Sequence, residues 1–327
     1  MPELARRLGI GEFLVKDETS RLGLPAFKIL GASWAAYREL CGRLELDPLE
    51  MSIDALHHAL RAERFPLVTA SEGNHGRAVA RVASWLGLGA RVYLPDSTAV
   101  ARRDAIVAEG AEVVMVDGDY DDAVDKAAHD ADGVLIQDQA TPGYEKIPGL
   151  IADGYRSIFA EVDQQLQGED PPDLVLVQIG VGSFASAAVA HFRREGGRGV
   201  PKLVGVEPLG AECAMAAASH GGIVTLPSTR ESIMAGLNCG TVSELAWPVL
   251  SSGVEVFVAV GDERCREAVR QLADCGMEVG ASGAAGLAGL LELLGGPGSA
   301  VARAHLSLNE STKVLVVATE GVTNPEE

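Results

Sequence analysis

Apolar residues recur along this chain with two patterns, one typical of helices and one typical of short buried strands. Helical spacing of apolar residues predicts one helix over 28–44 and a second, capped by Ser52, that ends near residue 64. Beyond this point, short apolar strands alternate with helical stretches. The expected strands are PLVTA, RVYLP, EVVMVDG and VLIQD, with helices near 75–86, 98–109 and 120–131. This alternation predicts βαβ units and a parallel sheet.

A second series of the same kind follows a helix near 149–166. Its strands are DLVLVQI, LVGVEP, EVFVAV and KVLVVATEG, with helices near 183–195 and 211–219 and two more before the last strand. We therefore expect an α/β protein with two parallel-sheet-based domains. The large domain is expected to be discontinuous, 1–38 with 149–327, and to hold the small domain, 39–148, as an insertion.

Composition narrows the class of protein. Of the 327 residues, 47% are apolar and 22% charged, which is typical of a globular enzyme. The formal net charge of −19 argues against a nucleic-acid partner. MPELARRLGI lacks the apolar core of a signal peptide, and no apolar run approaches the ~18 residues of a membrane span. We expect a cytoplasmic protein with no membrane partner. Its five cysteines show no metal-binding spacing, so they are expected to be reduced thiols and no metal site is expected.

Lys28 is the first candidate for chemistry. It lies between Phe27 and Ile29, and Pro25 suits the first position of a helix, so Lys28 is expected in the first turn. There the helix dipole and partial burial both disfavour the ammonium form, and a neutral amine can form a Schiff base with an aldehyde cofactor. The alternative is a structural lysine whose stem covers the core while its charge reaches water.

Two glycine-containing turns each follow a strand and open a helix. Ser71–Gly76 reads SEGNHG and Gly180–Ala185 reads GVGSFA. Backbone N–H groups in such turns suit a phosphate, although similar turns occur in many α/β proteins. The second turn also fits the dinucleotide fingerprint G-x-G-x-x-[GA], with Glu207 in the place of the ribose ligand. That interpretation leaves Lys28 and the first turn without a role.

Thr319 ends the last predicted strand. A hydroxyl at the carboxyl end of a parallel strand points to the crevice where α/β sheets bind ligands, and it can hydrogen-bond to a ring nitrogen. The alternative is a β-branched strand residue that is polar without function.

Taken together, these stretches resemble a known family. The motifs KDETSRLGLPAFKILGA, SEGNHGRAVA, IQDQATPGYEKIP, GVGSFA, SIMAGLNCG and ATEG follow one another from about Val15 to Gly321. In this order they resemble the fold-type II pyridoxal-phosphate enzymes, and within them the diaminopropionate ammonia-lyases. The resemblance implies pyridoxal 5′-phosphate in the cleft between two domains. It assigns the Schiff base to Lys28, the cofactor's phenolic oxygen to Asn74, and the pyridine nitrogen to Thr319. It assigns the phosphate to Gly180, Val181, Gly182 and Ser183.

The resemblance also assigns carboxylates. Glu72 would remove the α-proton of a D-substrate, Lys28 would serve the L-isomer, and Asp138 would assist. This chain departs from the family at three places. Glu72 replaces an aspartate, Pro25 replaces an asparagine, and Gln139–Pro142 replaces a loop that carries a tryptophan.

The resemblance implies a pyridoxal-phosphate-dependent carbon–nitrogen lyase. The expected reaction is α,β-elimination of a small amino acid, 2,3-diaminopropionate, to pyruvate and ammonia, by a homodimer. Three alternatives stay open. They are a related activity such as serine or threonine dehydration, racemisation or β-replacement; an NAD-dependent oxidoreductase; and a non-catalytic amino-acid-binding protein.

Overall fold

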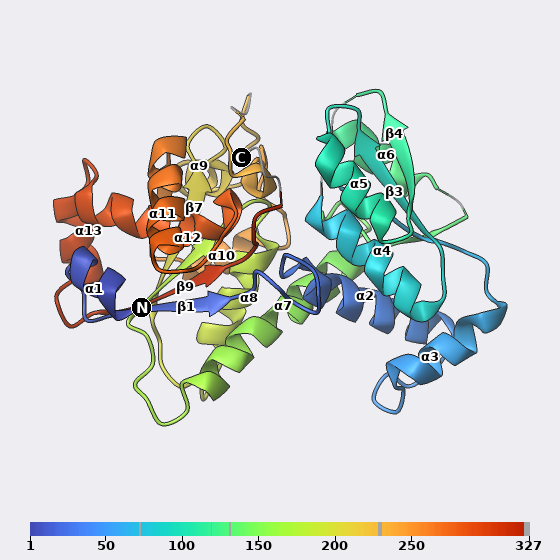
Figure 1. Cartoon of the computed structure of the whole chain (residues 1–327), viewed down its shortest axis with the longest axis horizontal. Helices are drawn as coiled ribbons and strands as arrows, with labels where there is room; N and C mark the ends of the chain where they lie inside the picture. The colour runs from blue at the N-terminus through green and yellow to red at the C-terminus, as the bar shows by residue number, and fades with distance from the viewer. Residues whose placement is uncertain (72, 119, 131, 228–230, 324–327) are drawn as a thin grey trace. The chain divides into compact units, whose positions relative to one another are not determined.

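The computed structural model describes residues 1–71, 73–118, 120–130, 132–227 and 231–323. These residues form two compact units, coloured along the chain in Figure 1. The larger unit joins Met1–Ser20 to Arg156–Glu327, and the smaller unit is Arg21–Tyr155. The smaller unit is therefore continuous in sequence, and the larger one is not.

The larger unit contains one five-stranded parallel sheet of order β1-β9-β6-β7-β8. Its strands are β1 (Glu12–Asp17), β6 (Leu174–Gln178), β7 (Lys202–Pro208), β8 (Val256–Val260) and β9 (Lys313–Ala318). Its helices are α1 (Pro2–Leu8), α8 (Ser183–Phe192), α9 (Cys213–His220), η2 (Ala235–Leu237), α10 (Trp247–Gly253), α11 (Asp262–Asp274), α12 (Ala281–Gly295) and α13 (Ser299–Leu306). Figure 1 shows β1, in blue, beside β9, in red, although the two strands lie at opposite ends of the chain.

The core of the larger unit explains the apolar runs of its strands. Every residue of β6 and β9 is buried, as expected for parallel strands covered on both faces. Helix α12 packs across β6, β7, β8 and β9. Gly289 allows this close approach, because a Cβ there would lie 2.5 Å from Cγ2 of Val206. Among the described helices none is by itself long and apolar enough to cross a membrane, and only the bent pair α12 and α13 meets that test by length and composition.

The smaller unit contains a four-stranded parallel sheet of order β4-β3-β2-β5. Its strands are β2 (Leu67–Ala70), β3 (Ala90–Pro95), β4 (Glu112–Val116) and β5 (Val134–Leu135). Its helices are α2 (Lys28–Arg43), α3 (Ile53–Ala59), η1 (Leu60–Ala62), α4 (Asn74–Leu86), α5 (Val100–Ala108) and α6 (Tyr120–Ala128). Helix α7 (Lys146–Gln165) begins in this unit and continues into the larger one.

The parallel α/β architecture confirms the predicted fold class. Ser52 caps α3 as predicted, since its Oγ accepts a hydrogen bond from the backbone N–H of Ala55 at 3.1 Å. Pro25 was wrongly placed inside a helix, because α2 begins only at Lys28. The predicted strand VLIQD is shorter than expected. Its ladder ends where the N–H of Gln137 donates to the hydroxyl of Tyr144 at 3.0 Å instead of to a strand.

The boundaries of the compact units in the sequence differ from those of the predicted domains. Residues 21–38, expected in the large domain, belong to the smaller unit, because α2 packs against α4 there. Compactness alone does not decide where two domains separate. The domain boundaries after residues 38 and 148 therefore stay a prediction.

Candidate active site

Lys28 is the first residue of α2, so its backbone lies in the first helical turn as predicted. The position of the helix is set by close packing against the middle of α7, around Gly154. A Cβ at Gly154 would lie 2.5 Å from the carbonyl oxygen of Leu30, and one at Gly31 would lie 2.6 Å from Cε1 of Tyr155. Glycine at these two positions lets the helix backbones approach closely. The backbone around Lys28 is thereby held in place.

The Lys28 side chain forms an ion pair with Asp138. Nζ lies 2.8 Å from Oδ2, and the two side chains are 26% and 11% exposed. Burial by itself would raise the pKa of Asp138, but the charge of Lys28 and its hydrogen bond to the carboxylate outweigh this effect, so that pKa lies well below its usual range. Lys28 therefore has a carboxylate partner. Sequence spacing did not place Asp138 beside it, and the neutral amine expected for the Schiff base stays a prediction.

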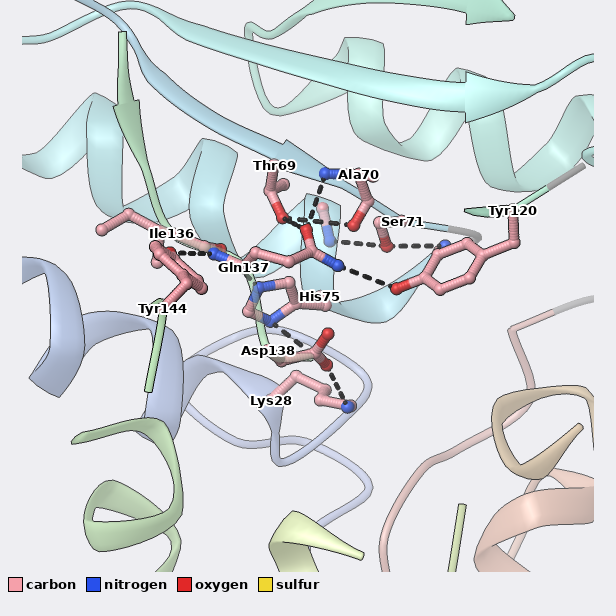
Figure 2. A network of polar contacts seen from close by, with 12 residues as sticks. Lys28, Thr69, Ala70, Ser71, His75, Tyr120, Ile136, Gln137, Asp138 and Tyr144 are labelled. Atoms are coloured by element: carbon pink, nitrogen blue, oxygen red, sulfur yellow. Dashed lines mark hydrogen bonds and ion pairs between the residues drawn. The ribbon is translucent and has the colours of Figure 1, made fainter. Parts of the chain in front are cut away.

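His75 lies against the same carboxylate (Figure 2). Its Nε2 is 2.7 Å from the carbonyl oxygen of Ile136, and because a carbonyl only accepts, Nε2 must carry the proton. Nδ1 lies 3.8 Å from Oδ2 of Asp138 and has no hydrogen-bond partner among the described residues. Burial lowers the pKa of His75, so the imidazole is neutral at pH 7. Its unprotonated nitrogen therefore faces the Lys28–Asp138 pair.

Gln137 fixes the backbone that carries Asp138 (Figure 2). Its Oε1 accepts from Oγ1 of Thr69 at 2.8 Å and from the N–H of Ala70 at 2.9 Å. Its Nε2 donates to the hydroxyl of Tyr120 at 2.9 Å. Sequence reasoning did not single out Gln137. The available signal was an amide side chain in an otherwise apolar strand, next to the candidate carboxylate.

The turn Ser71–Gly76 closes on the Ser71 hydroxyl. Its Oγ accepts from the N–H of Gly73 at 3.0 Å and from the N–H of Gly76 at 2.8 Å. Asn74 is the first residue of α4, so the predicted helix opening is confirmed. Glu72, the predicted base for a D-substrate, lies outside the described residues.

The second turn, in the larger unit, also opens a helix as predicted. Helix α8 begins at Ser183, and its N-cap residue, Gly182, supplies no side-chain hydrogen bond to the first turn. Gly182 has φ +103°, and a Cβ there would lie 2.8 Å from Cβ of Ala246. The carbonyl oxygen of Val181 accepts from the N–H of Ser243 at 2.9 Å, which ties the turn to the following segment. This geometry suits an anion at the helix N-terminus.

Thr319 directly follows β9, at the edge where β6 ends with Gln178. Its side chain is buried, with 4% exposed. Nε2 of Gln178 donates to Oγ1 of Thr319 at 3.2 Å. The strand-end position of the hydroxyl is as predicted. Sequence reasoning missed its partner Gln178, whose only signal was a polar residue at the end of a fully apolar strand.

Glu207 does not have the geometry of a ribose ligand. Its carboxylate accepts from the N–H groups of Ala214 and Met215 at 2.7 and 2.8 Å and is fully buried. Its acceptors are thus used to cap α9. Across the described ranges, no group of three or more His, Cys, Asp or Glu side chains is arranged to hold a metal ion.

The chain belongs to the family of pyridoxal-phosphate-dependent enzymes, whose model matches residues 1–320. It is 36% identical, over 100% of its length and 85% of the relative's, to diaminopropionate ammonia-lyase from Salmonella typhimurium. Among solved structures, holo diaminopropionate ammonia-lyase from Escherichia coli has a TM-score of 0.90 at 35% identity, covering 99% of this chain and 84% of that one. The same enzyme in complex with D-serine has a TM-score of 0.91 at 34% identity, with the same coverage. The predicted family and cofactor class are confirmed, and the dinucleotide interpretation was wrong.

The side chains in both units fit pyridoxal phosphate. The smaller unit offers the partly exposed amine of Lys28 beside a carboxylate. For a phosphate, the larger unit offers the N-terminus of α8, whose N-cap residue Gly182 supplies no side-chain hydrogen bond. A Cβ at Gly180 or Gly182 would meet neighbouring atoms at 3.1 or 2.8 Å. It also offers the Thr319 hydroxyl for a ring nitrogen. Every type of group that the cofactor needs is present.

Proposed function

We propose that this protein is a lyase that uses pyridoxal phosphate to eliminate ammonia from 2,3-diaminopropionate. The observation that carries the proposal is the Lys28–Asp138 ion pair at the start of α2, in a chain that matches diaminopropionate ammonia-lyases over its full length. In the overall reaction, diaminopropionate and one water give pyruvate and two molecules of ammonia. Neither an oxidant nor a reductant is needed.

The residue assignments form part of this proposal. Lys28 binds the cofactor covalently, Asn74 contacts its phenolic oxygen, and Thr319 contacts its ring nitrogen. The segment Gly180–Ser183, including Val181 and Gly182, binds its phosphate. Support for these roles comes from the family resemblance of the motifs and from the local geometry of each residue.

The cofactor, when bound, supplies an aldehyde that bonds to amines and a ring that accepts negative charge from the substrate Cα. Nζ of Lys28 takes the Cα proton of the L-isomer, and the carboxylate of Glu72 takes that of the D-isomer. After this transfer, the hydrogen bond to Oδ2 of Asp138 holds the proton at Nζ of Lys28. Nζ can then donate this proton to the departing β-amino group. Because Nδ1 of His75 carries no proton, His75 donates no hydrogen bond to Asp138. The carboxylate therefore stays available to accept from Nζ of Lys28.

We also propose that the enzyme is a cytoplasmic homodimer. Its five cysteines are free, and three of them are buried, which suits a reducing compartment. Two-fold homodimers are the most common soluble oligomers. Light scattering of the purified protein measures the oligomeric state directly, and a mass of one subunit would contradict this part of the proposal.

The test begins with the purified protein and its visible spectrum. A yellow protein that loses its colour in Lys28→Ala supports the cofactor assignment. Pyruvate release is then measured with D- and L-diaminopropionate and with D- and L-serine. Serine is included because the Escherichia coli relative has been solved with D-serine. Turnover of serine alone would replace the proposed substrate, and a colourless wild-type protein would overturn the proposal.

A further inference from the structure

Gln178 holds an unusual position at the end of β6. Its side chain is 2% exposed, and its Nε2 faces four oxygen atoms. These are the carbonyl oxygens of Val317 at 2.8 Å, Ser282 at 3.1 Å and Gly283 at 3.3 Å, and Oγ1 of Thr319 at 3.2 Å. All five residues belong to the larger unit.

The carbonyl groups decide which way the amide of Gln178 points. Carbonyl oxygens only accept hydrogen bonds, so the end of the amide that faces three of them must be the NH2 group. Its other end, Oε1, is buried without a hydrogen-bond partner in the part of the chain that the structure describes. Rotating the amide by half a turn would pair Oε1 with three carbonyl oxygens, which is worse. The orientation is therefore set by the backbone.

This orientation fixes the polarity of the Thr319 hydroxyl. An amide nitrogen donates hydrogen bonds and accepts none, so the hydroxyl can only accept from Gln178. The hydroxyl proton must then point to another group. Within the described residues no atom accepts a hydrogen bond from Oγ1 of Thr319. The Thr319 hydroxyl is thus oriented to donate its proton to a further acceptor.

We propose that Gln178 is a positioning residue that keeps the Thr319 hydroxyl as a donor toward the pyridine nitrogen, so that this nitrogen stays unprotonated. The inference rests on the proposed function, since it takes Thr319 as the partner of the ring. If the pyridine nitrogen were protonated, its hydrogen would face the hydroxyl hydrogen of Thr319, and neither group could accept. A pyridine ring with an unprotonated nitrogen is less electron-withdrawing, which favours rapid expulsion of a β leaving group.

The test reads the ring nitrogen directly. The holoenzyme is prepared with pyridoxal phosphate labelled with ¹⁵N in the ring, and the nitrogen chemical shift is followed from pH 6 to pH 9. The wild-type signal is expected at the position of an unprotonated nitrogen throughout. In Gln178→Met, which is similar in size but has no donor, the hydroxyl becomes free to accept. Its signal is expected to move toward the protonated position as the pH falls.

The chain offers matched controls. Gln137 is equally buried, belongs to the smaller unit and also hydrogen-bonds a threonine, so Gln137→Met is expected to leave the nitrogen signal unchanged. Thr319→Val removes the hydroxyl and is expected to shift the signal as Gln178→Met does, whereas Thr319→Ser is not. Loss of one ordered hydrogen bond is expected to weaken cofactor binding by roughly fivefold in Gln178→Met.

The possible results separate the two proposals. A wild-type protein that does not take up the cofactor, or a Lys28→Ala variant that keeps its colour, refutes the proposed function. A wild-type holoenzyme with a protonated ring nitrogen at pH 7 overturns the role of Gln178, and so does an unshifted signal in Gln178→Met. If that variant does not fold, Gln178→Asn keeps a buried amide but withdraws it from Thr319. The same shift is then expected, and its absence contradicts the inference.

Discussion

Replacing Gly154 with alanine tests whether the packing of α2 on α7 sets the position of Lys28. The new Cβ would lie 2.5 Å from the carbonyl oxygen of Leu30 and 2.9 Å from Cα of Gly31. Both are backbone atoms, so no side-chain rotation relieves the contact. To restore even a tight contact of 3.4 Å, α2 must move away by at least 0.9 Å, the difference from 2.5 Å. Lys28 lies at the start of the same helix.

Two opposing effects determine the stability of Gly154→Ala. Overpacking typically costs about 1–3 kcal/mol, and the better helix propensity of alanine offsets about 1 kcal/mol. We expect a net loss of roughly 1 kcal/mol of unfolding free energy. The effect on catalysis should be larger, because misplacing a reacting group by ~1 Å can cost about a hundredfold in rate.

Gly149 provides the matched control on the same helix, because no atom lies within 4 Å of a Cβ at this position. Gly149→Ala is expected to stabilise the protein by up to ~1 kcal/mol and to leave kcat/KM unchanged. Pyruvate release, coupled to lactate dehydrogenase, and thermal melting of both variants provide the measurements. If Gly154→Ala melts above the wild type and keeps its kcat/KM, the packing argument is wrong.

Three further predictions concern single groups. Asp138→Asn is expected to lower kcat/KM by roughly 10²–10⁴-fold and to destabilise by about 2 kcal/mol at pH 7, less than a fully buried pair because Lys28 is 26% exposed. Since the pKa of Asp138 is depressed in the folded state, this difference in stability should persist above pH ~4 and shrink on acidification below it, in denaturant titrations. Gly182→Ala forces a non-glycine residue to φ +103°, so we expect the free energy of unfolding to fall by about 1–3 kcal/mol. We also expect weaker cofactor binding, measured by spectral titration. Unchanged binding would contradict the phosphate assignment. Burial raises the pKa of Glu207 to about 7, so folding favours its protonated form, and unfolding free energy should fall by up to about 3 kcal/mol as the pH rises from ~4.5 through 7. A flat pH dependence over that range, compared with Glu207→Gln, would count against this pKa.

Much of the architecture was readable from local patterns. The apolar runs LVLVQ and KVLVVA are β6 and β9, and Ser52 and Asn74 stand where helices begin. These signals are local because burial periodicity and helix capping involve residues within about a turn of each other. The motifs around Lys28, Gly180 and Thr319 likewise identified the family without coordinates.

Only the tertiary structure decided which distant residues meet. Lys28 and Asp138 are 110 residues apart in sequence, and Gln178 and Thr319 are 141 apart. No local spacing predicts such pairs, because their contact depends on strand order and helix packing. The Lys28–Asp138 ion pair and the hydrogen bond that Thr319 accepts from Gln178 both depend on this packing. The sequence by itself therefore determined the kinds of chemical group present and the elements that carry them, whereas long-range packing decided which of these groups pair and in which direction their hydrogen bonds run.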